Sequence, residues 1–110
     1  MRAHVELSSK AGRDLKRLGS GPDRKAVIDA LNVGLAAIPQ PGNLDIKALE
    51  GAAPWLRLRV GDYRIVYRPL DRSEASSLAV RRNLPTVSEG YLVARIVHRR
   101  ELERAVASLL

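Results

Sequence analysis

The sequence predicts an α+β fold, a small antiparallel sheet with two N-terminal helices on one face and a short C-terminal helix. Two patterns carry this prediction. Residues 55–69 alternate apolar and polar side chains on both sides of Gly61-Asp62, which is typical of a β-hairpin. The stretches 9–18 and 22–38 repeat apolar residues at helical spacing. Because the chain has 110 residues, 45% of them hydrophobic, we expect residues 1–110 to form a single domain.

The N-terminal third contains one short strand and both long helices. Residues 3–7 alternate weakly and predict the strand. Ser8 or Ser9 can cap a helix over residues 9–18, and Pro22 fits the first turn of a second helix that Pro39 ends. The apolar stripes of these helices are Ala11, Leu15 and Leu18 in the first, and Val27, Ile28, Leu31, Leu35 and Ile38 in the second.

The remaining elements surround the hairpin. Residues 39–54 are rich in Pro and Gly and predict a loop. Residues 70–90 predict a long polar connection that contains a strand segment at 76–80. Residues 91–98 predict the last strand, and residues 99–110 predict the C-terminal helix. The two N-terminal helices must bury their stripes against the apolar face of the sheet, which leaves the other face open.

That open face is rich in arginine. With Gly61 and Asp62 as the loop, Val60 faces Tyr63 and side chains then alternate between the two faces. The last strand has an apolar face of Leu92, Ala94 and Ile96, and its other side joins the arginine face. Like charges opposite each other destabilise a sheet, so the pattern favours an anionic ligand. Six arginines would share this face: Arg57, Arg59, Arg64, Arg68, Arg95 and Arg99.

The charge of the whole chain agrees with an anionic partner. The formal net charge is +7 and the pI is about 10.6. Residues 55–110 hold eleven basic and six acidic side chains, and all eleven basic ones are arginine. The planar guanidinium binds two phosphate oxygens at once, so these observations favour nucleic acid or an acidic protein as the partner.

Several classes of protein are excluded by composition. The absence of cysteine excludes disulfides and cysteine-based zinc sites. The first ten residues lack the apolar core of a signal peptide, and the apolar runs are too short to span a membrane. We therefore expect a cytoplasmic protein without a membrane partner.

The chain contains "LEG" followed by "WLRLRVGDYRIVYRP", and then "VARIVHRREL" near the end. These motifs, in this order, resemble those of the RelE/ParE superfamily of bacterial toxins. The resemblance implies a RelE-like toxin fold and a cognate antitoxin. A RelE-like member implies an endoribonuclease that cuts mRNA on the ribosome without metal or cofactor. A ParE-like member implies an inhibitor of DNA gyrase that cuts nothing, and a third reading is a toxin-like chain that only binds partners.

The resemblance also carries residues over. Arg57 and Arg59 match the two basic residues on the strand before the turn, and Arg64 matches the arginine after the turn tyrosine. The arginine at the end of the last strand is Arg99, or Arg100 if the register slips. Where RelE-like enzymes often carry a tyrosine, this chain has Glu103 or Val106.

Metal-free RNA cleavage requires a base for the 2′-OH, cations for the phosphorane, and an acid for the 5′ oxygen. Arg59, Arg64 and Arg99 are the predicted cations at the scissile phosphate, because arginine stabilises developing negative charge but cannot act as a base near neutral pH. His98 is the candidate acid–base group, although its register directs it away from Arg99, and Glu103 is the alternative. The predicted ligands of flanking RNA phosphates are Arg57, Arg68, Arg95, Arg100 and Lys47.

Overall fold

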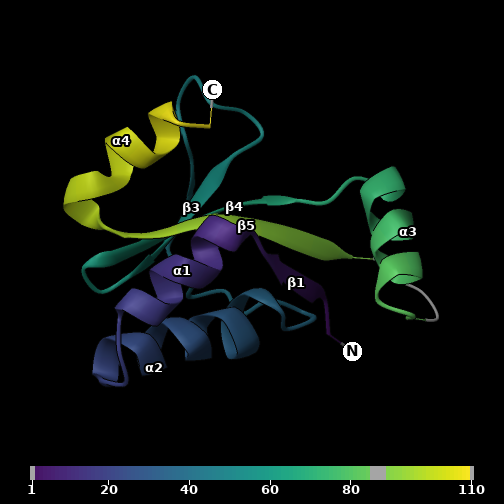
Figure 1. The fold of residues 1–110 in the computed structure, drawn as a ribbon, viewed down its shortest axis with the longest axis horizontal. Coiled ribbons are helices and arrows are strands. Elements are labelled where there is room, and N and C mark those ends of the chain that lie inside the picture. Colours follow the sequence, from purple (N-terminus) through teal and green to yellow (C-terminus); the bar gives the residue numbers. More distant parts are fainter. Residues whose placement is uncertain (1, 85–88, 110) are drawn as a thin grey trace.

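The computed structural model describes residues 2–84 and 89–109, which form a five-stranded mixed sheet with helices on both faces (Figure 1). The strands lie in the order β1-β5-β4-β3-β2. Their bounds are β1 His4–Leu7, β2 Ile46–Ala48, β3 Leu56–Val60, β4 Tyr63–Pro69 and β5 Gly90–His98. The helices are α1 Ser9–Arg17, α2 Pro22–Asp29, α3 Arg72–Arg81 and α4 Leu102–Ala107, with a π-helical turn η1 at Ala30–Leu35 and a 3₁₀ turn η2 at Arg99–Glu101. The predicted α+β architecture is confirmed.

The hairpin of β3 and β4 has the predicted register. Val60 pairs with Tyr63 and Arg59 with Arg64, and Gly61 takes the positive φ of 58° that the tight turn requires. The prediction succeeds here because both strands, the loop and the alternation lie within one short segment, so the pairing depends only on local sequence.

The two N-terminal helices cover one face of the sheet, as predicted (Figure 1). Ser8 is the N-cap of α1, since its hydroxyl accepts a hydrogen bond from the amide of Ala11. The second predicted helix is present but changes its hydrogen bonding: α2 passes into η1, where the amide of Ala36 donates to the carbonyl of Leu31. The core between these helices and the sheet is built from Ala11, Val27, Leu31, Leu35, Leu58, Ile65, Tyr67, Val93 and Ile96.

Two strands correct the predicted sheet. β1 pairs with β5 in parallel, so the sheet is mixed and not wholly antiparallel. β2 lies within residues 39–54, which were predicted as a loop, and it pairs with β3 at the edge of the sheet. A strand of three residues is too short to produce a recognisable alternation, and its pairing with Leu56–Leu58 supplies the order that its own sequence does not.

The predicted strand segment at 76–80 is wrong, because these residues lie in α3. The carboxylate of Asp71 accepts from the amide of Glu74, and the Glu74 side chain accepts from the amide of Asp71. This capping box starts the helix, and Ala75 and Leu78 bury one side of it. The part of the predicted connection at residues 85–88 lies outside the described residues.

The predicted faces of β5 are also partly wrong, because its pairing with β4 contains a bulge between Val66 and Tyr67. Val93 pairs with Tyr67 and Ile96 with Ile65, so both contribute to the core beneath the helices although they are three residues apart. Leu92, predicted on that face, instead pairs with Arg68. A bulge moves every later side chain to the opposite face, and the sequence carries no local signal for it.

The second face of the sheet is not left open, contrary to the prediction. α4 lies on this side, opposite α1 and α2 (Figure 1), and Val66, Val97 and Ala105 are buried there. α3 stands at the end of the sheet away from the hairpin turn. No helix in the described part of the chain has the length and apolar character that crossing a bilayer requires.

Candidate phosphate-binding site

Four of the predicted arginines gather at the turn between β3 and β4, and we call them the hairpin cluster: Arg57, Arg59, Arg64 and Arg99. Arg59 and Arg64 lie directly opposite each other in the hairpin. Arg99 follows β5, and its amide donates to the carbonyl of Asp62 in the turn at 2.7 Å. This backbone hydrogen bond joins the end of β5 to the hairpin turn. It therefore brings Arg99 close to Arg59 and Arg64, although they are far apart in the sequence.

The positive charges of these guanidinium groups act on one another. Burial of Arg64 lowers its pKa, and the positive charges of Arg59, Arg57 and Arg99 lower it further. Arg64 also donates to the carbonyls of Gly61 and Tyr63, which hold its side chain against the turn. A half-buried arginine surrounded by three others is unfavourable alone, and a bound phosphate would relieve the repulsion.

Two carboxylates, Asp45 and Asp62, lie within ion-pair distance of the four arginines and neutralise part of this charge. Asp45 accepts from Arg57 at 3.0 Å and lies 3.9 Å from Arg59, and the Arg57 hydrogen bond lowers the pKa of its carboxyl group. Asp62 lies 3.6 Å from Arg99, but both side chains are well exposed. Arg59 and Arg99 remain 57% and 59% exposed, so the cluster presents free guanidinium groups to solvent.

The other two predicted arginines are bound by carboxylates outside the cluster. Arg68 forms two hydrogen bonds with Glu74 of α3, at 2.7 and 2.6 Å, and its guanidinium lies 5.5 Å from the centre of the Trp55 ring. The hydrogen bond from Arg68 lowers the pKa of Glu74 to about 2. Arg68 is therefore positioned to hold α3 on the sheet, and its charge is already neutralised.

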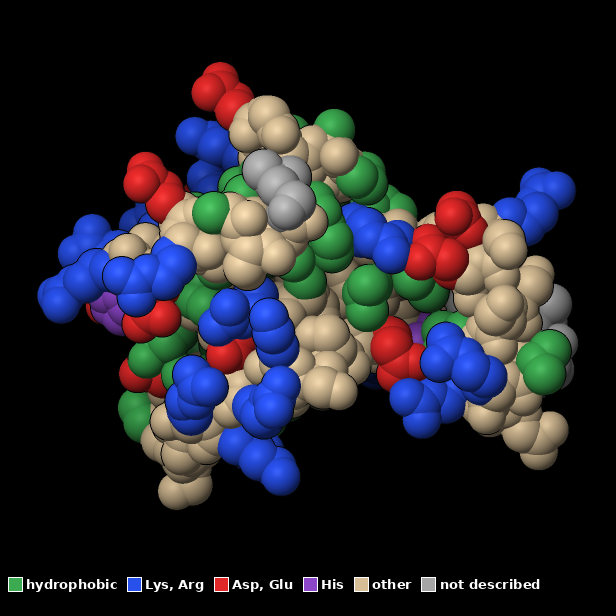
Figure 2. Space-filling model, turned by 45° about the horizontal axis from the view of Figure 1, so that its top comes forward, with side chains coloured by type: hydrophobic (Ala, Val, Ile, Leu, Met, Phe, Trp, Pro, Cys, Tyr) green, Lys and Arg blue, Asp and Glu red, His purple; other side chains and the backbone are tan. Residues whose placement is uncertain are grey.

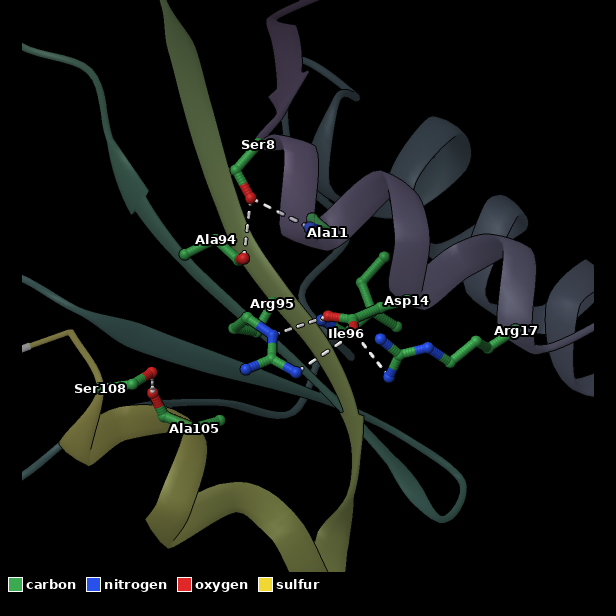
Figure 3. A network of polar contacts seen from close by, with 9 residues as sticks. All are labelled: Ser8, Ala11, Asp14, Arg17, Ala94, Arg95, Ile96, Ala105 and Ser108. Carbon is green, nitrogen blue, oxygen red and sulfur yellow. Dashed lines mark hydrogen bonds and ion pairs between the residues drawn. The ribbon is translucent and has the colours of Figure 1, made fainter.

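Arg95 belongs to a network at the outer edge of β5 (Figure 3). It forms two hydrogen bonds with Asp14 of α1, at 2.9 and 3.2 Å, and Asp14 also accepts from the amide of Ile96 at 2.9 Å. Ser8 donates to the carbonyl of Ala94. β1 covers only the first half of β5, so these side chains satisfy backbone groups along the second half. Asp14 is 4% exposed, and the interaction with Arg95 joins α1 to the sheet.

His98 lies on the face of the sheet that α1 and α2 cover, as the predicted strand register indicated. Its ring packs edge-on against Tyr63 with 5.7 Å between centroids, and its Nδ1 accepts from the amide of Arg100. It pairs with Tyr63 across the sheet and so points away from the hairpin cluster. Of the remaining predicted groups, Lys47 of β2 pairs with Arg57 of β3, and Arg100 and Glu103 are exposed in η2 and the first turn of α4.

The sequence reasoning did not identify the carboxylates that divide the arginines into two groups: Asp14, Asp45 and Glu74. Only Glu74 has a local signal, the Asp71-x-x-Glu74 capping box. The described residues contain no group of three or more His, Asp or Glu side chains that could hold a metal ion. The arginines of the cluster can bind an anion and stabilise developing negative charge.

Comparisons with known proteins agree with the fold. Residues 5–83 match the family model described as the ParE toxin of the type II toxin–antitoxin system. The chain is 22% identical to a chain of the RelB–RelE antitoxin–toxin complex from Methanococcus jannaschii, covering 91% of this chain and 96% of that one, with a TM-score of 0.55. It is 23% identical to a chain of the RelBE2 toxin–antitoxin complex from Mycobacterium tuberculosis, covering 90% and 100%, with a TM-score of 0.56. No curated protein matches significantly in sequence.

Proposed function

We propose that this chain, which belongs to the ParE toxin family of type II toxin–antitoxin systems, is a metal-free, ribosome-dependent mRNA endoribonuclease. The membership in the RelE/ParE superfamily that the sequence predicted is confirmed. The single observation that carries the proposed activity is the convergence of Arg59, Arg64 and Arg99 at the hairpin turn, where the side chains of Arg59 and Arg99 are more than half exposed.

The reaction we propose is attack of a ribose 2′-OH on its own phosphate. The 2′ oxygen forms a bond to phosphorus and its proton passes to a base. The bond to the 5′ oxygen of the next nucleotide breaks, and that oxygen takes up a proton from an acid, which leaves a 2′,3′-cyclic phosphate and a 5′-OH. Arg59, Arg64 and Arg99 would stabilise the additional negative charge on the phosphorane through charge-assisted hydrogen bonds. Arg57 is held by Asp45, so we assign it to orienting the substrate together with Lys47.

The structure changes the roles proposed for two arginines. The sequence assigned Arg68 and Arg95 to flanking phosphates, but Glu74 and Asp14 already bind them in bidentate geometry. We propose that both arginines serve the fold. Arg100 remains a proposed phosphate ligand because it is exposed next to Arg99.

The proposed reaction also requires a residue that accepts the 2′ proton. His98 points to the opposite face from the hairpin cluster, so we do not assign it as the base. Glu103 occupies one of the two positions where the family resemblance places a tyrosine, and it is exposed at the start of α4. We propose Glu103 as the residue of this chain to test as the proton acceptor.

A second function is favoured by a specific observation. The matching family model is described as a ParE toxin, and the ring of His98 packs against Tyr63 on the face opposite the hairpin cluster. Both facts favour an inhibitor of DNA gyrase that binds through its basic surface and cuts nothing. In either case, we propose an antitoxin partner with an acidic segment that covers the hairpin cluster, and its affinity should increase as salt concentration falls.

The deciding experiment is induction of the chain alone in bacteria, followed by mapping of mRNA 5′ ends and measurement of plasmid supercoiling. New 5′ ends within codons, absent after induction of Arg59→Ala/Arg64→Ala, would support the endoribonuclease. Growth arrest with relaxed plasmids and unchanged mRNA ends would contradict it and favour the gyrase inhibitor. Normal growth with confirmed soluble protein would leave only a binding role.

A further inference from the structure

A second basic surface lies between α1 and β5, away from the four residues of the hairpin cluster. It is a groove of about 240 Å³, and we call it the α1 groove; its lining is Lys10, Arg13, Asp14, Arg17 and Arg95. Figure 2 shows Lys and Arg side chains gathered on one side of the molecule, below and to the left of its centre. Neither the family membership nor the proposed reaction assigns a role to Lys10 or Arg13.

The groove retains a positive charge after its internal ion pairs are counted. Asp14 is its one acidic residue, and the interactions with Arg95 and the amide of Ile96 already use both of its oxygens. Arg17 lies 3.8 Å from Asp14 but is 73% exposed. Within the described residues, Lys10 and Arg13 form no ion pair, and both are exposed. Three cations therefore line the groove with little compensation.

The spacing of these cations suits an extended polyanion. Positions 10, 13 and 17 fall on one face of a helix, and the seven residue steps from Lys10 to Arg17 span about 10 Å of helix axis. A nucleic acid strand in a helix carries one phosphate every ~3.4 Å of axis, so the face matches several phosphates better than one free ion.

The groove also leads toward the hairpin. A neighbouring cavity of about 170 Å³ shares Asp14 and Arg17 with it and reaches Tyr63 and His98 at the beginning of β4 and the end of β5. This cavity ends where β5 ends, at His98 and Glu101, on the face of the sheet opposite the hairpin cluster.

We propose that the α1 groove binds the phosphate backbone of RNA beyond the segment held at the hairpin cluster. The choice of RNA rests on the proposed function, whereas the choice of a polynucleotide rests on the lining. All five lining side chains are charged. An acidic protein segment normally requires apolar anchors at the centre of its contact, and this groove offers none. A phosphate backbone is bound through charge alone and needs no such anchor.

The test uses the full chain and a fluorescent 20-nucleotide oligouridylate as the probe, with binding measured by anisotropy over a series of salt concentrations. We expect Lys10→Ala/Arg13→Ala to weaken binding about tenfold and to reduce the salt slope by roughly 1.4, for two phosphate contacts on a single strand. The matched control is Lys25→Ala/Arg72→Ala, which removes the same two residue types from exposed positions outside both basic surfaces. It should change affinity by less than about twofold.

Equal weakening by both double variants, or no weakening by the groove variant, would overturn the proposal. Selective loss of binding to a polyglutamate peptide, with RNA binding intact, would also overturn it in favour of an acidic protein partner. Lys10→Arg/Arg13→Lys preserves both charges, and it must retain affinity with an unchanged melting temperature. Because the readout is binding, absence of mRNA cleavage by the unmodified chain would contradict the proposed function and leave this inference intact.

Discussion

The two ends of the arginine-bearing sheet face use the same residue type in opposite ways. At the hairpin end, Arg59 and Arg64 face each other, and the nearby carboxylate of Asp45 is hydrogen-bonded to Arg57. Along the rest of the face, Arg68 and Arg95 are each bound by two oxygens of one carboxylate and are 21% and 19% exposed. The difference lies in the counter-ions, because the strands present arginines of both kinds on the same side.

This difference shows how one pattern can serve both stability and binding. The carboxylates that neutralise Arg68 and Arg95 belong to helices, α3 and α1, that pack against the sheet there. The hairpin turn extends beyond these helices, and Asp45 in the loop before β2 is shared between two arginines. Arginines become available for a ligand where no helix supplies an acidic partner. The following predictions compare the two ends, beginning with the largest expected effect.

The largest effect should come from the neutralised end. Asp14→Ala leaves Arg95 without its partner and the amide of Ile96 without an acceptor in a buried position. Breaking a buried pair typically costs about 3–5 kcal/mol, so the free energy of unfolding in urea should fall by that amount. Asp45→Ala at the hairpin end, where the carboxylate is exposed, should change it by less than about 1 kcal/mol. A similar loss of unfolding free energy in the two variants would contradict the proposed difference between the two ends.

The next effect concerns the reaction rate at the free end. Arg64→Ala should reduce the single-turnover rate of mRNA cleavage on saturated ribosomes by roughly 100-fold, because it removes a donor to the developing negative charge. Arg68→Ala should leave that rate within a few-fold, because Glu74 and Trp55 are its partners. If Arg68→Ala lowers the rate as much as Arg64→Ala, the division of the face into two roles is wrong.

The smallest effect is a pH dependence at Glu74. Its pKa is about 2 in the folded protein, below the ordinary value of 4.5, so Glu74 binds fewer protons in the folded state than in the unfolded state. Its contribution is fully present above pH 4.5 and is lost as the pH falls toward 2. Because the side chain is 34% exposed, we expect no more than about 1 kcal/mol.

Unfolding free energies of the unmodified chain and Glu74→Gln, measured between pH 6 and 2.5, test this prediction. The difference between the two proteins should shrink as the solution becomes more acidic. A constant difference would mean that the charge of Glu74 does not stabilise Arg68, and the neutralised end would then depend on packing alone. The chain is the same in all other respects, so unrelated acid titrations cancel in the comparison.

The sequence predicted the parts of the fold that depend on neighbouring residues. The hairpin register followed from Gly61-Asp62 and strict alternation, and α1 from Ser8 and its apolar stripe. Parallel pairing of β1 with β5 joins residues some 86 positions apart, as His4 with Gly90, and alternation in either strand contains no information about its partner. The bulge at Val66 and Tyr67 shifts the pairing of β5 with β4, and the alternation within either strand does not predict it.

The candidate site shows the same limit. The residues on the arginine face were identified from alternation. The orientation of His98 toward the face that α1 and α2 cover also followed from it. Alternation could not distinguish Arg95 from Arg59, because the distinguishing carboxylate, Asp14, lies 81 residues away from Arg95 on α1. Charge at a position can be read from sequence, whereas its neutralisation depends on tertiary packing.

The placement of α3 makes this helix a suitable site for a fluorescent label. The helix starts with its own capping box and stands at the end of the sheet away from the hairpin turn (Figure 1). Ser76 is exposed on it, next to the buried Ala75. The chain contains no cysteine, so Ser76→Cys would create a single thiol for attaching a fluorophore. Such a label would follow the docking of the toxin on a ribosome, gyrase or antitoxin in real time while leaving both basic surfaces unmodified.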